Sequence, residues 1–151
     1  MAGEVISESI LIIASIVLAG ILAGAIFYAV TFVSTGFDSA SVNMAQKLTT
    51  SLTIVYATNT SSTTVVFYIQ NVGQTPIYMS FSTVYFGKVY ELQQIGYNSV
   101  PGWSTTTTVL YPGSTAQVTI TLSCTLQQNQ YYEIMFVAPN GYETTYVFEV
   151  M

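Results

Sequence analysis

The sequence contains no histidine, only one cysteine, and only two basic side chains, Lys47 and Lys88, against seven acidic ones. Histidine is the usual general base and metal ligand, and zinc sites and disulfides need more than one thiol. Two lysines are also too few to neutralise a row of nucleic-acid phosphates. We therefore expect no catalytic, cofactor-binding or metal site, and no nucleic-acid partner.

The single cysteine, Cys124, follows the alternating apolar residues Val118, Ile120 and Leu122. A free cysteine is usually a small buried hydrophobe, so the pattern predicts that Cys124 lies in a core. A reactive thiol is the alternative.

Charge is absent from a long stretch near the N-terminus, because no charged side chain occurs between Ser9 and Phe37. At about 1.5 Å per residue, this stretch would form a helix about 43 Å long, which exceeds the roughly 30 Å of bilayer hydrocarbon. A single segment in lipid satisfies its backbone hydrogen bonds only as a helix. The stretch therefore predicts one membrane-spanning helix in contact with lipid.

Apolar residues continue at helical spacing beyond this stretch, through Val42, Ala45 and Leu48. The spacing predicts that the helix extends out of the membrane and that it and its extension occupy residues 1–51. Gly36 is the favoured position for a break or bend.

The apolar segment has no basic residue before it and is too long for a secretory signal, so we expect it to be retained as an anchor. Within it, Gly20, Ala23 and Gly24 form a patch of small residues that permits close approach of a second helix. This predicts self-association through the helix, and self-association through the C-terminal domain, alone or in addition, stays open. The alternative is that glycine is simply common in membrane helices.

Few charged residues are available to predict the orientation of the chain in the membrane. The positive-inside rule, applied to Lys47 alone, would place the C-terminal part in the cytoplasm. The Thr-rich and Lys-poor composition of that part is instead typical of an exported protein. This composition favours a single-pass protein of the cytoplasmic membrane with its C-terminal domain outside the cell.

From Leu52 onward the hydrophobic period changes to two, which is typical of half-buried strands. Short strands separated by turn residues, with no helix between them, predict an all-β sandwich of the immunoglobulin-like kind over residues 52–151. The predicted strands are Leu52–Ala57, Thr64–Asn71, Ile77–Phe86, Val89–Ile95, Thr106–Tyr111, Ala116–Ser123, Tyr131–Ala138 and Tyr142–Val150.

Turn signals separate these strands, notably Gly87-Lys88, Pro112-Gly113 and Asn140-Gly141, the last of which fits a two-residue hairpin connection. Strand parity places Glu143 and Glu149 on the solvent side of the last strand. The residues predicted to face the core are Val65, Phe67, Ile69, Val118, Ile120, Leu122, Tyr142, Tyr146, Phe148 and Val150.

A turn-rich stretch, Gly96–Thr105, contains Tyr97 and the only tryptophan, Trp103. Loops often carry binding residues and tryptophan is frequent at hot spots, so Tyr97 and Trp103 are candidate partner contacts. The alternative is that Trp103 folds back onto one end of the sandwich. Asn59-Thr60-Ser61 is the single sequon, which makes Asn59 a candidate N-glycosylation site.

The N-terminal residues also resemble a known family. Ile6-Ser7, Ile10 and the run from Ile13 to Gly20 are similar to the N-terminal segment of the FlaF/FlaG family of archaellum accessory proteins, within the archaellin and archaeal type IV pilin superfamily. The turn Ile69–Gly73, followed by Pro76-Ile77, matches that family in architecture. The resemblance implies an archaellin-like β-sandwich outside the membrane, in the pseudoperiplasm. It also implies a static role around the archaellum motor, with a FlaF-like protein and the S-layer as partners.

Filament-forming members of the superfamily carry a short basic leader that is removed after a glycine. Here Gly3 is followed by Glu4, and Glu8 occupies the fifth position after such a cut, as in pilins. The segment Met1-Ala2-Gly3 lacks a basic residue, so we expect no processing.

Three functions are compatible with these features. The first is a structural, stator-like component of the archaellum, and the second is a filament-forming archaellin or archaeal type IV pilin subunit that assembles through its N-terminal helix into an extracellular filament. The third, an enzyme or solute-binding module, would need two convergent carboxylates. The acids available in the β domain are Glu91, Glu133, Glu143 and Glu149.

Overall fold

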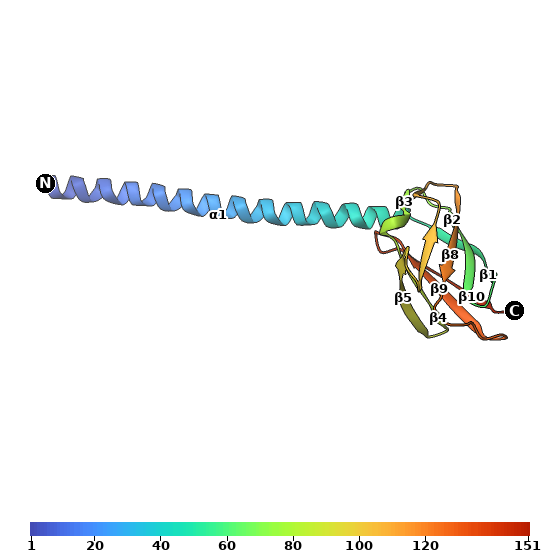
Figure 1. Cartoon of the computed structure of the whole chain (residues 1–151). Coiled ribbons are helices and arrows are strands. Elements are labelled where there is room, and N and C mark those ends of the chain that lie inside the picture. Colours follow the sequence, from blue (N-terminus) through green and yellow to red (C-terminus); the bar gives the residue numbers. More distant parts are fainter. The chain divides into compact units, whose positions relative to one another are not determined.

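The structure, a computed structural model, describes residues 1–151. The chain forms two compact units, Met1–Val42 and Asn43–Met151. The first unit is entirely helical, and the second contains the end of the helix and all the strands (Figure 1). The expected domain boundary between residues 51 and 52 stays a prediction.

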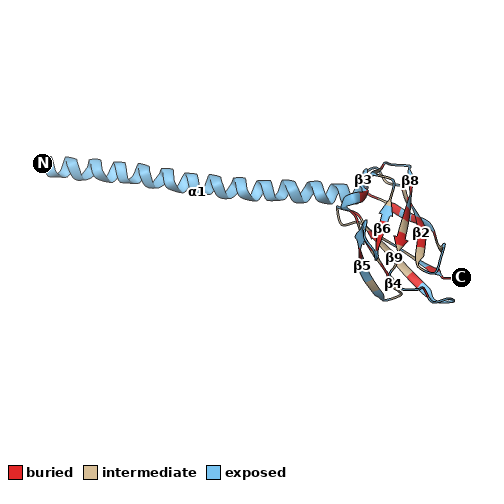
Figure 2. Ribbon diagram, in the orientation of Figure 1, coloured by how far each residue is buried: buried red, intermediate tan, exposed pale blue.

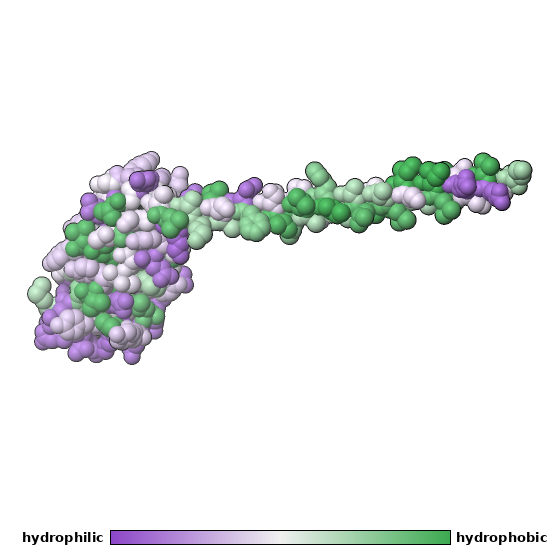
Figure 3. Space-filling model, turned by 180° about the vertical axis from the view of Figure 1, so that it is seen from behind, coloured by the Kyte–Doolittle hydropathy of each residue, from purple (hydrophilic) through white to green (hydrophobic).

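The helix, α1, runs from Ala2 to Thr49 and buries none of its residues (Figure 2). Its surface is apolar along most of its length, with a hydrophilic patch near the N-terminus (Figure 3). By length and composition it is able to cross a membrane. The polar side chains of Ser15 and Thr31 donate to the carbonyls of Leu11 and Phe27, both at 2.8 Å, so they are satisfied within the helix.

The expected break at Gly36 does not occur, because α1 is continuous through this residue. A glycine in a helix interior costs only about 1 kcal/mol relative to alanine. The helix continues for several turns on both sides of Gly36, so the cost of one glycine is not enough to end it.

The β domain is an eight-stranded sheet with strand order β1-β2-β8-β6-β5-β4-β9-β10, and a two-stranded sheet pairs β3 with β7. Its two end strands, β1 and β10, lie side by side, so the large sheet folds into a nearly closed sandwich. This confirms the predicted fold class. The strands are β1 Leu52–Asn59, β2 Thr64–Asn71, β3 Ile77–Tyr78, β4 Thr83–Lys88, β5 Glu91–Tyr97, β6 Gly102–Thr105, β7 Val109–Leu110, β8 Thr115–Thr121, β9 Tyr131–Val137 and β10 Glu143–Glu149.

The core lies between the two faces of this sandwich, where the buried residues of Figure 2 gather. Parity predicted most of it correctly. Val65, Phe67, Ile69, Val118, Ile120, Phe148 and Val150 are buried, whereas Leu122, Tyr142 and Tyr146 are half-buried against the core. Glu143 and Glu149 are exposed, as predicted.

Several predicted boundaries were wrong. The strand expected over Ile77–Phe86 is divided by a 3₁₀ turn, η1, at Met79–Phe81, and the full burial of Met79 anchors this turn in the core. The hairpin between β4 and β5 turns at Val89-Tyr90, two residues later than expected, because Gly87 and Lys88 remain paired in β4.

The last hairpin also differs from the prediction. Its connection includes Pro139 as well as Asn140 and Gly141, and it is closed by a bond from the Ala138 N–H to the Tyr142 carbonyl. Gly141 has φ +85°, so glycine supplies the left-handed residue that such a longer loop needs. The connection is therefore not a two-residue turn.

Cys124 is exposed, which corrects the prediction that it lies in the core. The strand β8 ends at Thr121, and from there the amides of Leu122 and Leu126 donate to the Thr63 and Ser62 carbonyls. The alternation that predicted burial therefore stops before it reaches Cys124.

Candidate interaction site

The last turn of α1 belongs to the same compact unit as the sandwich and is hydrogen-bonded to it. The Thr49 carbonyl accepts from the Gln74 amide at 2.8 Å, and the hydroxyls of Thr49 and Thr75 lie 2.6 Å apart. The Asn140 side-chain amide donates to the Thr50 hydroxyl at 2.7 Å. Two separate loops of the sandwich thus hold the end of the helix.

The following residue, Ser51, completes this junction. Its carbonyl accepts from the amides of Val72 and Gly73, at 2.9 and 3.0 Å. A Cβ at position 73 would collide with the Ser51 nitrogen and would lie 2.6 Å from the Thr49 carbonyl oxygen. Close approach of the two backbones therefore requires glycine at this position.

A buried asparagine supports the same loop. Asn71 is 0% exposed, and its side-chain amide donates to the carbonyls of Thr75 at 2.8 Å and Leu110 at 3.0 Å. Its side-chain oxygen accepts from the Gly73 amide at 3.0 Å. Because each of these bonds involves a backbone group of a turn or short strand, Asn71 fixes the loop to which the helix is bonded.

Of the two candidate contact residues, only Tyr97 remains at the surface. Trp103 is 2% exposed and packs against Phe136, with ring centroids 6.3 Å apart, while Tyr97 is 39% exposed and lies 4.8 Å from the Trp103 ring. Trp103 thus adopts the alternative arrangement, folded onto the sandwich, and offers little area to a partner. Tyr97 remains a predicted contact.

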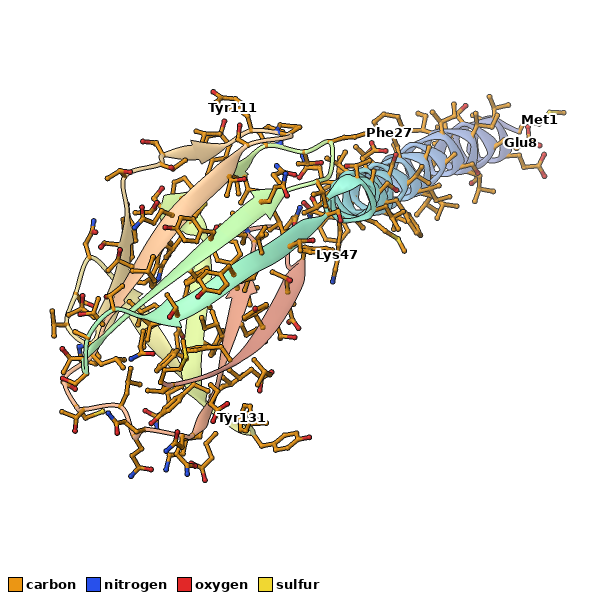
Figure 4. All side chains as sticks on the ribbon, turned by 90° about the vertical axis from the view of Figure 1, so that its right-hand side faces the viewer. Met1, Glu8, Phe27, Lys47, Tyr111 and Tyr131 are labelled. Atoms are coloured by element: carbon orange, nitrogen blue, oxygen red, sulfur yellow. The ribbon has the colours of Figure 1, made fainter.

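Other aromatic side chains are more exposed than Tyr97. Tyr78 and Phe81 form an edge-to-face pair, and Phe81 is 73% exposed. Tyr111 and Tyr131 project from opposite sides of the sandwich in Figure 4. Exposed tyrosines present an apolar ring and a polar tip, which suits protein contacts.

Asn59 lies half-buried at the end of β1, beside the C-terminal residue. Its side-chain amide donates to the Met151 carbonyl and its side-chain oxygen accepts from the Met151 amide, both at 3.3 Å. Glycosylation of Asn59 would replace one amide hydrogen, so a glycan there would be placed next to these bonds.

The remaining predicted site residues lie on α1. A Cβ added at Gly20 or at Gly24 would meet no atom within 4 Å, and Ala23 is exposed beside them, so this small-residue patch is open to another helix. Gly3, Glu4 and Glu8 lie in the exposed first turns of the same helix.

No group of three or more histidine, cysteine or acidic residues is arranged to hold a metal ion. A groove beside β5 contains Glu91 but none of the other three acids of the sandwich. A convergent carboxylate pair in a pocket, which the third function needs, is therefore not formed there.

Residues 2–148 match the family described as archaeal-type flagellin. The chain belongs to this family. No curated protein gave a significant match.

Two solved structures share more than half of their aligned residues with this chain. The archaellum periplasmic stator protein FlaG of Sulfolobus acidocaldarius is 52% identical, with a TM-score of 0.63, over 66% of this chain and 99% of that one. A chain in the FlaF and FlaG complex from the same organism is 53% identical, with a TM-score of 0.62, over 64% of this chain and 87% of that one. The predicted resemblance to the FlaF/FlaG family is thereby confirmed.

A more distant structure has the family's complete architecture. A chain of the archaeal flagellum of Methanospirillum hungatei matches 96% of this chain with a TM-score of 0.73, at 16% identity. At that identity the likeness concerns the fold alone, namely a long N-terminal helix followed by a sandwich.

Within the family fold, sequence reasoning missed the groove beside β5. Its walls come from β5, which pairs with β4, and from residues 122–127, which follow β8 and are hydrogen-bonded to the loop between β1 and β2. No local pattern shows that such segments face one another. Gln93 is exposed although it lies on the same side of β5 as the buried Ile95. This exposure indicates a gap in the sandwich only when the positions of the neighbouring strands are known.

Proposed function

We propose that this chain is a stator-like structural component of the archaellum, anchored in the cytoplasmic membrane and linking the motor to a FlaF-like protein and the S-layer. The observation that carries the proposal is the 52% identity to the stator protein FlaG, which extends over 99% of that chain. The FlaF and FlaG complex supports a FlaF-like partner. No chemical step is required of the protein.

The physical task of such a component is to resist motor torque. The apolar α1 holds the chain in lipid, where removal of its side chains into water would be costly. The hydrogen bonds at Thr49, Thr50 and Ser51 join the end of the helix to two loops of the sandwich. A force on the sandwich is therefore carried to the helix through several bonds rather than through one flexible linker.

The proposal places the sandwich outside the cytoplasmic membrane. Its surface carries many hydroxyl and amide side chains and exposed tyrosines but few lysines. The stator protein FlaG is described as periplasmic, which supports the same side for this chain.

A second candidate function is a filament subunit. The match of 96% of this chain to a chain of the Methanospirillum hungatei flagellum includes the long helix and favours this alternative at the level of fold. In such a filament, Gly20, Ala23 and Gly24 would allow helices to approach closely.

Deletion of the gene tests the stator proposal. In the deletion strain we expect tethered cells to stop rotating and the full-length chain, supplied on a plasmid, to restore rotation. Normal rotation and normal archaellum assembly in the deletion strain would contradict the proposal.

Mass spectrometry of the N-terminus distinguishes the two candidates. A stator predicts a chain that keeps Gly3 and stays in the membrane fraction after the filaments are sheared off. A mature chain that begins at Glu4 and is abundant in the sheared filaments would favour the filament subunit.

A further inference from the structure

A groove of about 460 Å³ opens the side of the sandwich between β5 and the segment Leu122–Gln127. Its floor is apolar, because it is formed by core residues that are between 6% and 8% exposed, namely Phe86, Ile95, Leu126 and Tyr132. Its rim is polar. The groove is therefore a place where the core of the domain reaches the surface.

The edge of β5 that faces the groove has no strand beside it. Residues Glu91 to Ile95 pair with β4 on one side, while β6 joins β5 only at Gly96 and Tyr97. An unpaired strand edge presents a row of backbone donors and acceptors that another strand is able to satisfy.

Side-chain parity along β5 points to the same gap. Ile95 is buried, and Gln93 and Glu91 lie on the same side of the strand but are exposed. In a completed sandwich this side of the strand would be covered. No segment of the chain therefore covers the core beside Gln93.

The opposite wall also has free backbone groups. The amides of Leu122 and Leu126 are bonded to β1–β2 loop carbonyls, whereas Ser123, Cys124 and Thr125 make no backbone hydrogen bond within the protein and are exposed. A hydrogen bond joins the two walls at one end of the groove, where the Lys88 ammonium donates to the Gln127 side-chain oxygen at 2.8 Å.

We propose that this groove binds an extended segment of a protein partner, which adds to β5 as an extra strand. The inference rests on the proposed function, since it assigns a surface to the FlaF-like partner. Main-chain bonds to β5 would provide affinity, and side chains at alternate positions would enter the apolar floor.

The walls of the groove select the kind of segment that fits. The residues Ser123–Gln127 line the groove across from β5, so the far edge of an added strand would face these residues and not a further strand. The occupant therefore needs two free edges. In a second copy of this chain, Val150 is buried and Met151 is held by Asn59, so these two residues are not free to serve as the segment. A partner's terminal or loop segment meets the requirement.

Charge further defines the occupant. Glu91 is exposed at the groove, whereas Lys88 is already engaged by Gln127. We therefore infer an occupant with apolar residues at alternate positions and a basic residue near Glu91.

Tyr90 extends this surface beyond the groove. It occupies the tip of the β4–β5 hairpin with φ +68° and is 95% exposed. A left-handed conformation is unfavourable for a bulky residue, and Tyr90 gains no burial in return. Contact with the partner would bury the Tyr90 ring, which the rest of the hairpin leaves exposed.

Cys124 offers a direct test, because it is the only thiol in the chain and it lines the groove. The full-length chain in detergent micelles is labelled with a maleimide, with and without saturating FlaF of Sulfolobus acidocaldarius, the partner in the solved complex. We expect bound FlaF to slow the labelling of Cys124 at least fivefold. The matched control, Cys124→Ser with Thr145→Cys, carries an exposed thiol on β10, outside the groove, and should be labelled at an unchanged rate.

A pair of variants tests the same surface by affinity. Gln93→Lys places a charge over the apolar floor and should weaken FlaF binding at least tenfold, whereas Gln117→Lys, on the exposed side of β8, should leave it within twofold. Circular dichroism checks that both variants are folded. If Gln93→Lys does not fold, the labelling of Cys124 alone tests the groove assignment.

The outcomes separate the two proposals. Binding of FlaF with unprotected Cys124 would overturn the groove assignment alone. Failure of the unmodified chain to bind FlaF would overturn both the FlaF-like partner and the groove assignment.

Discussion

At the scale of single residues, the behaviour of polar groups depends on contacts that are distant in sequence. Asn71 belongs to a predicted strand, yet its side chain bonds the carbonyl of Leu110. Cys124 was expected in the core because it follows three alternating apolar residues, and it is exposed because β8 ends before it. Parity predicts the core only as far as the strand itself extends.

Asn71→Ala tests the importance of the buried amide. The change leaves the Leu110 and Thr75 carbonyls without the Asn71 donor, while the Gly73 amide keeps only its bond to the Ser51 carbonyl. An unsatisfied buried group costs about 1–3 kcal/mol. We expect the free energy of unfolding of the full chain in micelles to fall by about 2–4 kcal/mol in a urea titration.

The matched control is Gln128→Ala, which changes an exposed amide in the loop before β9. Its free energy of unfolding should stay within about 0.5 kcal/mol of the unmodified chain. Equal stability of both variants would show that the bonds of Asn71 contribute nothing.

At the scale of elements, strands with a strong alternating pattern and clear turn residues were predicted well. The strand over Thr64–Asn71 was placed correctly, and β9 and β10 differ from the prediction by one residue at some ends. β6 was missed because it is short, follows Pro101, and is defined by pairing with β8 and β5 rather than by its own sequence.

The junction between the end of α1 and the sandwich depends on the close approach of the Gly73 backbone to the backbone of Thr49 and Ser51. Gly73→Ala would place a methyl group against the Ser51 nitrogen and the Thr49 carbonyl. Since both neighbours are backbone, we expect a loss of about 1–3 kcal/mol in the free energy of unfolding.

Hydrogen exchange locates that effect. The amides of Val72 and Gln74, which donate to Ser51 and Thr49, should exchange faster in Gly73→Ala than in the unmodified chain. Gln128→Ala makes a suitable comparison, because it changes an exposed side chain outside the junction and should leave the two junction amides protected.

The small-residue patch of α1 makes a separate prediction. Gly20→Leu with Gly24→Leu should reduce dimer formation by the full chain in micelles at least fivefold, because two bulky side chains keep a second helix at a distance. Ala25→Leu with Ala29→Leu adds the same side chains on a different face of the helix and should have little effect. Equal dimerisation of the two double variants, measured by analytical ultracentrifugation, would contradict packing through Gly20 and Gly24.

At the scale of the whole molecule, the division into an apolar helix and a β-sandwich was evident from the sequence, because charge is absent from one segment and the hydrophobic period changes after it. The groove beside β5 was not, because it depends on where strands distant in sequence pair.

Orientation is a property of the whole molecule and is testable in intact cells. If the sandwich lies outside the membrane, external proteinase K should degrade it in cells stripped of their S-layer while a cytoplasmic marker survives. A band that stays intact until the cells are lysed would place the sandwich in the cytoplasm. An added glycan, lost in Asn59→Gln and detected by mass spectrometry of the chain, would be consistent with export.

The pairing of Asn59 with Met151 has a practical consequence for imaging. It holds the last residue beside the far end of β1, away from the end of that strand at which the last turn of α1 is bonded. A fluorescent reporter fused after Met151 would therefore sit on the pole of the domain opposite that junction. If that pole faces the cell wall lattice, a cell that carries such a fusion would show where the protein lies and yet be unable to swim.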